Sequence, residues 1–477
     1  MEQGKLKPRN ALGYSLFSVS EAIMYQFVNG YLLLYLTSVV HMGADNAGML
    51  VSVGMVFETI SSLVIGKMSD SCTSSRGRRR PFLLVCSLTV PFVILLLFTN
   101  FRDIVPESLL MVPYLIFNIL FWIEHGAMYI PYMALGAEIT TDYDDRTKLR
   151  SLSSGIGIVG SYLGTAAPLL VVAFLAKRGM SDTGSWFWTG AMAAFFAGAS
   201  MFLGWKLTEG VEHMPPDGTF DPRKALKEVP LVLKDYWELL KLKTMRILTV
   251  FKVLFNVGNA FFTSAMVFFL TYRLGMSNEE ISMVYTTQIV LRIFNVFLIS
   301  WIALKLGKSA TLLLTLTISG GCCVLFYLTG IHNYIMLMLY ILITTSAISS
   351  FWQVAGAIFD DVTEVDEFVS GKRREGAINS FQSGIGSLAT AAIFGAFGMY
   401  LETTGFDATL AAQPQTALVA LDRLFILCPG ICFLVACLIL VVYPLNKKRF
   451  HSLQSALRLK KQGRDYSLYQ EDLDKIL

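Results

Sequence analysis

The chain has 477 residues and a formal net charge of +4, and 54% of its residues are hydrophobic while 16% are charged. Ordinary globular domains have roughly 45–50% apolar and about 25% charged residues, so this composition excludes a set of soluble domains. The apolar residues lie in long blocks without the residue-by-residue alternation of a membrane β-barrel. We therefore predict an all-α membrane protein.

Twelve apolar segments are long enough to cross a bilayer core, which takes about 20 helical residues. In chain order they lie near residues 12–40, 46–68, 81–101, 108–137, 150–176, 186–208, 246–272, 279–305, 308–330, 332–360, 376–402 and 416–444. Most of the seven cysteines lie inside these segments, so we expect core packing rather than disulfides or metal ligation. The first segment has no clear cleavage site and is expected to be a retained helix.

Basic residues are distributed unevenly between the loops. Both termini, the loop between the second and third segments and the long loop in the middle of the chain carry most of the lysines and arginines. The positive-inside rule then predicts that both termini and the middle loop are cytoplasmic. The positive net charge therefore indicates topology and not nucleic-acid binding.

The middle loop divides the segments six against six. We expect an N-terminal bundle over residues 1–207, a cytoplasmic loop over 208–245, a C-terminal bundle over 246–445 and a cytoplasmic tail over 446–477. Acidic residues followed by basic residues recur at the exits of the fourth and tenth segments, at 138–150 and 361–374. Two parallel six-helix repeats around a central site are typical of major facilitator transporters. A coincidence of charged loops is the alternative explanation.

Four stretches carry a resemblance to a known family. Gly66 and Asp70 precede the arginine cluster at 76–80, as in the corresponding loop of major facilitator proteins. The stretches 130–138, 269–275 and 371–376 are similar to helix ends of one family within that superfamily. Together they resemble the glycoside–pentoside–hexuronide cation symporters over nearly the whole chain. That resemblance implies transport of melibiose-like sugars, glucuronides or xylosides with sodium or protons.

The charged residues at these helix ends are candidates for gating. A carboxylate can pair with the arginines, or face a helix N-terminus, and so hold one conformation. The predicted gating residues are Asp70, Arg78, Arg79, Asp142, Arg146, Asp361, Glu364 and Arg373.

Glu58 is the candidate for cation coupling. Charge inside a membrane is costly, which makes each case a functional candidate. The family pattern places two acids in the second helix, and Glu58 matches the first while Ser62 stands at the second. One carboxylate and one hydroxyl bind sodium only with further oxygens, whereas a desolvated carboxylate favours its protonated form and can carry a proton. The alternative for Glu58 is structural pairing with a cation such as Lys252.

The predicted sugar-contact positions depart from the family. Glu21 lies within a residue of a sugar-binding aspartate, whereas Tyr129 and Met133 replace an aspartate and a tryptophan. Ser154 and Ser387 stand where the family has an arginine and a lysine. The fold implied by the resemblance is unaffected, while substrate and cation stay open.

Polar and aromatic side chains inside the segments predict a translocation path. Lipid cannot satisfy them, so they must face the bundle interior or water; hydrogen bonding between helices is the alternative for any single residue. The predicted substrate-binding residues are Glu21, Tyr25, Glu124, Tyr129, Tyr132, Lys252, Asn256, Asn259, Arg292, Trp352, Gln353, Asn379 and Gln382.

The predicted function is cation-coupled symport of a glycoside, pentoside or hexuronide by alternating access. An amphiphile such as a lysolipid is the alternative substrate, and a receptor or channel is the alternative of another class. No nucleophile–base motif, nucleotide loop or metal cluster is recognisable, so neither an enzyme nor a bound cofactor is expected. The resemblance also implies a monomer in the plasma or inner membrane. We expect a lipid bilayer around the chain, a small-molecule substrate, sodium or a proton as coupling ion, and no nucleic-acid partner. Leu453, Leu457 and Leu459 predict an amphipathic helix in the tail.

Overall fold

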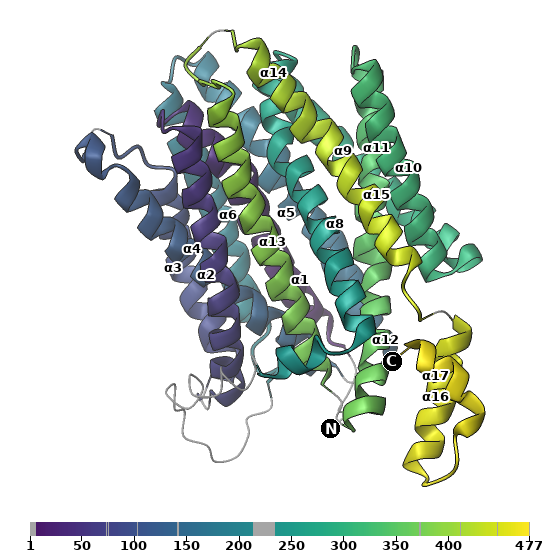
Figure 1. The fold of residues 1–477 in the computed structure, drawn as a ribbon. Coiled ribbons are helices and arrows are strands. Elements are labelled where there is room, and N and C mark those ends of the chain that lie inside the picture. The colour runs from purple at the N-terminus through teal and green to yellow at the C-terminus, as the bar shows by residue number, and fades with distance from the viewer. Residues whose placement is uncertain are drawn as a thin grey trace. The chain divides into compact units, whose positions relative to one another are not determined.

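The computed structural model describes residues 6–72, 74, 76–102, 104–140, 143–212, 234–371, 374–410, 412–445 and 447–476. Within these ranges the regular structure is helical throughout, and Figure 1 shows the long helices. The predicted all-α class is therefore confirmed.

The first six long helices follow the predicted segments closely. They are α1 (Pro8–Ser38), α2 (Ala44–Ser71), α3 (Arg80–Leu97), α4 (Met111–Ile139), α5 (Tyr143–Lys177) and α6 (Asp182–Leu207), with a short turn η1 (Glu107–Leu109) before α4.

The later helices are interrupted more often. They are α8 (Lys243–Phe268), α9 (Asn278–Leu306), α10 (Lys308–Thr329), α11 (Tyr334–Ser350), α12 (Gly356–Ser370), α13 (Glu375–Thr403), α14 (Gln415–Asp422) and α15 (Cys428–Val441). Three π-helical turns continue or join them: η2 (Phe269–Arg273), η3 (Phe351–Ala355) and η4 (Arg423–Leu427). Such turns are frequent at functional sites, and η3 contains two of the predicted site residues.

Among the described residues, eleven helices are long and apolar enough to cross a membrane. The remaining candidate is α1, which has 31 residues but lies outside that group because polar residues are interspersed along it. The chain is thus a multi-pass membrane protein with a helix at each of the twelve predicted segments.

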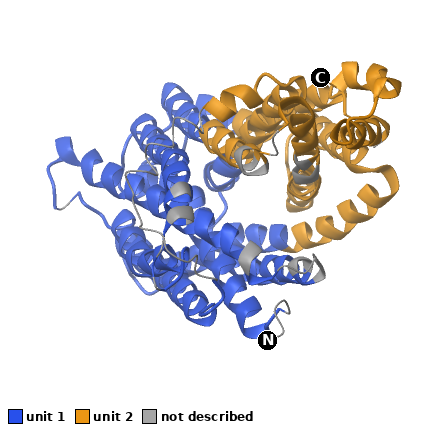
Figure 2. Ribbon diagram, turned by 90° about the horizontal axis from the view of Figure 1, so that it is seen from below, with its two compact units in different colours: residues 1–229, 263–289, 391–421 blue, residues 230–262, 290–390, 422–477 orange. Residues whose placement is uncertain are grey.

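Contacts group the chain into two compact units, coloured separately in Figure 2. Unit 1 contains residues 1–229, 263–289 and 391–421, and unit 2 contains 230–262, 290–390 and 422–477. Unit 1 therefore holds α1–α6, one end each of α8, α9 and α13, the turn η2 and α14 except for its last residue. This is a grouping by contact; the predicted six-plus-six repeat is a grouping by chain order and stays a prediction.

Close packing of α1 against α5 organises unit 1. A β-carbon at Gly160 would lie 2.4 Å from the backbone oxygen of Val19, and one at Gly164 would lie 3.0 Å from that of Ala22. Small residues allow backbones in membranes to approach in this way. Gly160 and Gly164 thus form a small-residue contact of α5 with α1.

The tail folds back onto unit 2. The helices α16 (Lys447–Lys461) and α17 (Gln470–Ile476), joined by the turn η5 (Ser467–Tyr469), bury a shared apolar cluster with α12. Leu453 and Leu457 belong to this cluster with Phe368. The predicted amphipathic helix is present, and its apolar face is covered by protein.

Candidate functional site

Glu58 of α2 and His125 of α4 form a buried hydrogen bond in unit 1. His125 Nδ1 lies 2.9 Å from Glu58 Oε1, and the two side chains are 3% and 13% exposed. Gly126 permits this close approach of α2 and α4, because a β-carbon there would lie 2.7 Å from Ser61 Oγ and 2.8 Å from Ser62 Oγ. A buried carboxylate needs such a partner. The sequence suggested Lys252 for this role, and the structure supplies His125.

Aromatic rings surround the imidazole. The Tyr129 ring stacks on His125 at 6.0 Å with 7° between the planes, and the Trp122 ring meets it edge-on at 5.4 Å. The Tyr25 ring of α1 lies 5.8 Å away and is 38% exposed. Its exposed face gives the cluster an accessible aromatic surface, suited to packing against a flat or apolar ligand face.

Glu21 of α1 adds a second carboxylate to this group. It is partly buried and interacts electrostatically with both His125 and Glu58. Three helices therefore bring together four of the predicted site residues, Glu21, Tyr25, Glu58 and Tyr129, around a histidine. We call these four residues and His125 the His125 cluster.

Tyr132 continues the polar wall along α4. Its hydroxyl lies 2.9 Å from Ser153 Oγ of α5, and its ring lies 4.7 Å from the ring of Tyr14. Tyr132 is buried by these contacts, so it ties α4 to α1 and α5 in this structure.

Glu124 points elsewhere, although it precedes His125 directly. Its carboxyl group interacts with Thr89 of α3, and its backbone oxygen accepts a hydrogen bond from Cys86 Sγ at 3.7 Å. Successive helical residues differ by about 100° around the axis, so neighbours in sequence face different helices. The structure does not bring Glu124 into the His125 cluster.

A second polar group lies in unit 2, between α8 and α13. A β-carbon at Gly386 would lie 3.4 Å from Lys252 Cε and 3.5 Å from Asn256 Nδ2, so the polar stripe of α8 faces α13. Asn256 Nδ2 donates to the backbone oxygen of Lys252 at 2.9 Å. Gln382, one turn before Gly386, is buried, and its Nε2 has no hydrogen-bond partner among the described residues. Asn259 lies on the same helix and has a polar partner of its own.

The remaining predicted residues of unit 2 are more accessible. Trp352 is 62% exposed, and Gln353 Oε1 accepts from Ser300 Oγ at 3.1 Å. Arg292 of α9 is exposed in the structure, and only 11% of the apolar window of that helix is buried. Its role in substrate binding stays a prediction. The side chain of Asn379 lies outside the described residues.

The arginine loop before α3 is held by an acid that the sequence did not single out. The backbone nitrogens of Arg79 and Arg80 donate to Glu212 Oε1 and Oε2 at 2.7 and 3.2 Å. A carboxylate at this position stabilises the N-terminus of α3. Arg78 is also described and has a polar partner. The side chains of Asp70, Asp142 and Arg146 lie outside the described residues, so their gating roles stay predictions.

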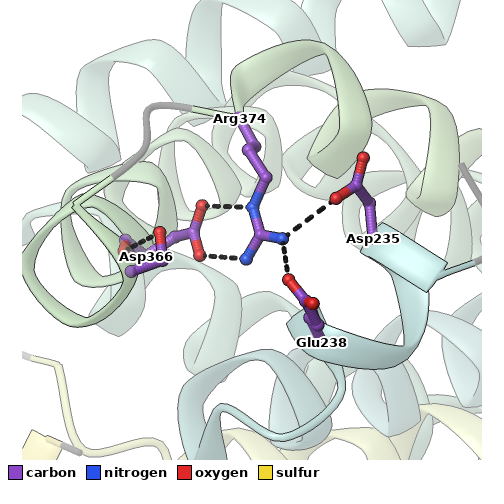
Figure 3. Close-up of polar contacts among 5 residues, drawn as sticks. Asp235, Glu238, Asp366 and Arg374 are labelled. Atoms are coloured by element: carbon purple, nitrogen blue, oxygen red, sulfur yellow. Dashed lines mark hydrogen bonds and ion pairs between the residues drawn. The ribbon is translucent and has the colours of Figure 1, made fainter. Parts of the chain in front are cut away.

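Arg374 is the centre of a charge network in unit 2 (Figure 3). Its guanidinium donates to Asp366 at 2.7 and 3.0 Å, to Glu238 at 2.7 Å and to Asp235 at 3.2 Å. The hydrogen bonds to Asp366 raise the pKa of Arg374 above its ordinary value. The neighbouring Arg373, predicted as a gating residue, lies outside the described residues.

The two acids of α12 that were predicted as gating residues have partners within unit 2. Asp361 Oδ1 lies 3.5 Å from Lys308 Nζ of α10, and Glu364 Oε1 accepts from Gln454 Nε2 of the tail at 3.1 Å. These partners lie on helices that are distant in the sequence, so the sequence alone could not identify them.

Within unit 1, side-chain contacts connect early and late helices at the helix ends opposite the arginine loop. We call the ends next to loops 39–43, 98–110, 178–181, 274–277 and 404–414 the far side. There Ser38 Oγ lies 2.6 Å from Tyr272 Oη, and Glu402 Oε2 accepts from the backbone nitrogen of residue 44 at 2.9 Å. Lys177 Nζ pairs with Glu279 Oε1 at 2.5 Å. These contacts close the far side of unit 1.

The described residues contain no candidate metal centre. No three or more His, Cys, Asp or Glu side chains are arranged among the described residues to hold a metal ion. What the described residues do offer is a carboxylate–histidine pair beside exposed aromatic surface, and a second polar group on α8 and α13.

Comparisons with known proteins agree with this architecture. Residues 13–447 match the family model described as MFS/sugar transport protein. The chain is 24% identical to the glucuronide carrier protein homolog of Escherichia coli, over 94% of this chain and 95% of that protein. It is 22% identical to the isoprimeverose transporter of Lactiplantibacillus pentosus, over 91% and 88%.

A solved structure shares the fold. The inward open xylose transporter XylE from E. coli matches with a TM-score of 0.61 and 15% identity, covering 94% of this chain and 98% of that one. Relatives of this kind are named as symporters, carriers and transporters, and not as enzymes. The chain therefore belongs to the MFS/sugar transport protein family, and it is a multi-pass membrane transporter of the symporter type.

Proposed function

We propose that this transporter is a cation-coupled symporter of a glycoside, pentoside or hexuronide, and that Glu58 is its coupling carboxylate. It works by alternating access in the cell membrane, with both termini in the cytoplasm and with the far side facing out.

The buried pair of Glu58 and His125 carries the proposal. A carboxylate near the centre of a membrane helix costs roughly 2.5–3.5 kcal/mol on insertion scales, so such a residue marks an ion or proton pathway by default. Here it lies in one cluster with Glu21, Tyr25 and Tyr129. Ion and substrate would then bind next to each other, where each can change the affinity for the other.

The printed names of relatives favour a sugar-type substrate. One relative is named a glucuronide carrier homolog and another an isoprimeverose transporter, which supports a sugar conjugate or a disaccharide as the substrate. The accessible Tyr25 ring supports a site in which the face of a ring-shaped solute packs against this aromatic ring.

Alternating access is supported by the kind of contact found on the far side. Ser38–Tyr272 and Lys177–Glu279 join side chains by hydrogen bonds and an exposed ion pair, which break at low cost. A far side closed in this way can reopen within a transport cycle.

The orientation follows from the basic loops. Lysines and arginines at 5–9, 67–80, 146–150, 223–243 and 372–374 gather on the side of the termini, opposite the far side. The far side then faces out of the cell.

The test is uptake into proteoliposomes over a panel of glycosides, pentosides, glucuronides and lysolipids, with sodium and proton gradients imposed separately. We expect uptake of one sugar class, raised by one gradient. Glu58→Gln should lose accumulation and keep exchange, while Glu107→Gln, an exposed carboxylate on the far side, should behave as wild type.

Two results would contradict the proposal in different ways. Full accumulation by Glu58→Gln would remove its coupling role. Translocation of a lysolipid, with no sugar taken up, would replace the substrate class by an amphiphile.

A further inference from the structure

We propose that the coupling ion is a proton, that it binds at Nε2 of His125, and that Glu58 acts as the counter-ion that positions this imidazole. The inference rests on the proposed function, because it names the ion of the same coupled transport.

The hydrogen bond between the two side chains decides which nitrogen is free. An ionised carboxylate only accepts hydrogen bonds, so with Glu58 ionised the proton of the neutral imidazole is on Nδ1. The other nitrogen, Nε2, is buried and has no hydrogen-bond partner among the described residues. It therefore keeps a lone pair that can accept a proton, in a side chain that is only 3% exposed.

A proton bound by the imidazole has a counter-ion in direct contact. Binding one proton forms a single N–H bond at Nε2 and converts a neutral ring next to a carboxylate into an imidazolium–carboxylate pair. Glu58 contacts the ring directly, and Glu21 of α1 interacts with it electrostatically. Release of the proton restores the starting pair, so one full cycle leaves no net change on the protein.

Other titratable groups near the imidazole come from α1, α4 and α5. From α1 come Glu21 and Tyr25, and from α4 comes Tyr129, whose ring stacks on the imidazole. Arg150 of α5 acts electrostatically on Tyr129. Glu124 of α4 faces α3 instead, so the two groups that act directly on the charge of His125 are the carboxylates of Glu58 and Glu21.

Sodium fits the same geometry poorly. Hard cations take several oxygen ligands, whereas Glu58 Oε1 is engaged by an imidazole nitrogen. Ser61 Oγ donates to the backbone oxygen of Glu58 at 3.0 Å, inside its own helix. Transporters that bind sodium commonly use unwound backbone, yet both α2 and α4 run as single α-helices through this region.

The position of Tyr25 provides the approach to the ring. It is the exposed aromatic neighbour of His125, whereas Trp122 is fully buried. A substrate that packs against Tyr25 would cover the imidazole and hinder loss of its proton, which is the coupling that symport needs.

The first experiment uses full-length protein in proteoliposomes without sodium. An imposed pH gradient, acid outside, should drive substrate accumulation in the wild type, and adding a sodium gradient should not increase it. His125→Gln should lose accumulation at least ten-fold and keep counterflow, which also shows that the variant is folded. His332→Gln, a histidine on an exposed loop, is the matched control and should accumulate like wild type.

The second experiment needs no substrate. A protonated imidazole quenches indole fluorescence more strongly than a neutral one, and Trp122 lies 5.4 Å from His125. We expect tryptophan emission of the purified protein to rise with pH over about pH 5 to 8, where imidazoles titrate. This pH-dependent change should shrink in His125→Gln and persist in His332→Gln.

The outcomes separate the two proposals. Sodium-driven accumulation that ignores the pH gradient, or unchanged accumulation in His125→Gln, would overturn the proton site while leaving symport intact. A pH-dependent emission that His125→Gln does not alter would overturn it as well. Failure to take up any sugar, with the emission change still dependent on His125, would instead count against the proposed substrate class.

Discussion

Arg374 holds Asp366 by two parallel hydrogen bonds, from Nε to Oδ2 at 3.0 Å and from Nη2 to Oδ1 at 2.7 Å. The remaining nitrogen, Nη1, reaches Glu238 and Asp235 on the helix formed by residues 234–239. The start of α13, the end of α12 and the middle loop are thus tied to one guanidinium (Figure 3). Such a planar fork is a property of arginine that lysine lacks.

Replacing Arg374 by lysine should therefore destabilise unit 2. The side chains of Arg374 and Asp366 are 11% and 1% exposed, and hydrogen bonds to charged groups contribute about 1.5–3 kcal/mol. We expect a lower thermal midpoint in detergent and slower transport, with substrate binding kept. Arg458→Lys, on the exposed face of α16, is the control and should leave both unchanged.

The Arg374 network should be insensitive to pH in the working range. The pKa of Arg374 is raised in the folded protein by Asp366, so its contribution is fully present below the ordinary arginine pKa and is lost only as the pH rises through the folded value. The stability difference between wild type and Arg374→Lys, measured by thermal unfolding, should stay constant between about pH 6 and 9. A difference that changes steadily with pH would show that another group titrates in the network.

Lys177 and Glu279 should bias the far side toward closure. Both are substantially exposed, at 68% and 42%, so the pair contributes about 0–1 kcal/mol and shifts the conformational balance by no more than about five-fold. Tyr285 of α9 is buried, with its ring 6.3 Å from that of Tyr31 of α1. Lys177→Glu should increase labelling of a cysteine placed at Tyr285 by an impermeant thiol reagent. The double exchange Lys177→Glu with Glu279→Lys should restore the wild-type rate; labelling that stays high in the double variant would refute the pairing.

Gly398 should be essential for far-side closure, while Gly155 should tolerate change. A β-carbon at Gly398 would lie 2.1 Å from the backbone oxygen of Ala44, whereas one at Gly155 meets nothing within 4 Å. We expect Gly398→Ala to slow transport strongly and to expose the far side to thiol labelling. Gly155→Ala should leave transport unchanged and raise helix stability by up to about 1 kcal/mol. Equal transport in the two variants would contradict the closure described here.

The tail should contribute to the stability of unit 2 through Leu453. This side chain is fully buried in the cluster of α12, α16 and α17, and removing such a leucine costs about 2–5 kcal/mol. Leu453→Ala should lower the thermal midpoint in detergent, while Leu468→Ala, at 86% exposure, should not. An unchanged midpoint in Leu453→Ala would mean that the tail unfolds separately from the rest of unit 2.

Much of the architecture was available from the sequence, because a bilayer imposes strong rules on a chain. Each span must be an apolar helix of about 20 residues, so the approximate positions of the long helices could be read from hydropathy. Charged residues such as Glu58 stand out against that background. Family motifs at helix ends then indicated a symporter, which the comparisons support.

The partners of these residues depended on the tertiary structure. His125 was one histidine among five, and Glu212 and Arg374 were single charges in polar loops. In the chain, His125 lies 67 residues from Glu58, Glu212 lies 133 residues from Arg79 just before α3, and Arg374 lies 136 residues from Glu238. The fold brings each of these pairs into contact, and the contacts give the three residues their roles. The position of Arg292 within an apolar segment likewise did not reveal how little of α9 is covered by other helices.

The sequence by itself therefore determined the all-helical class of fold, the approximate positions of the long apolar helices and the candidate coupling acid. These depend on local composition and on the cost of charge in lipid. Only the tertiary structure decided that Glu58 meets a histidine and that Arg374 joins three segments. Each of these contacts depends on how helices distant in the chain pack and rotate, which hydropathy along one helix does not encode.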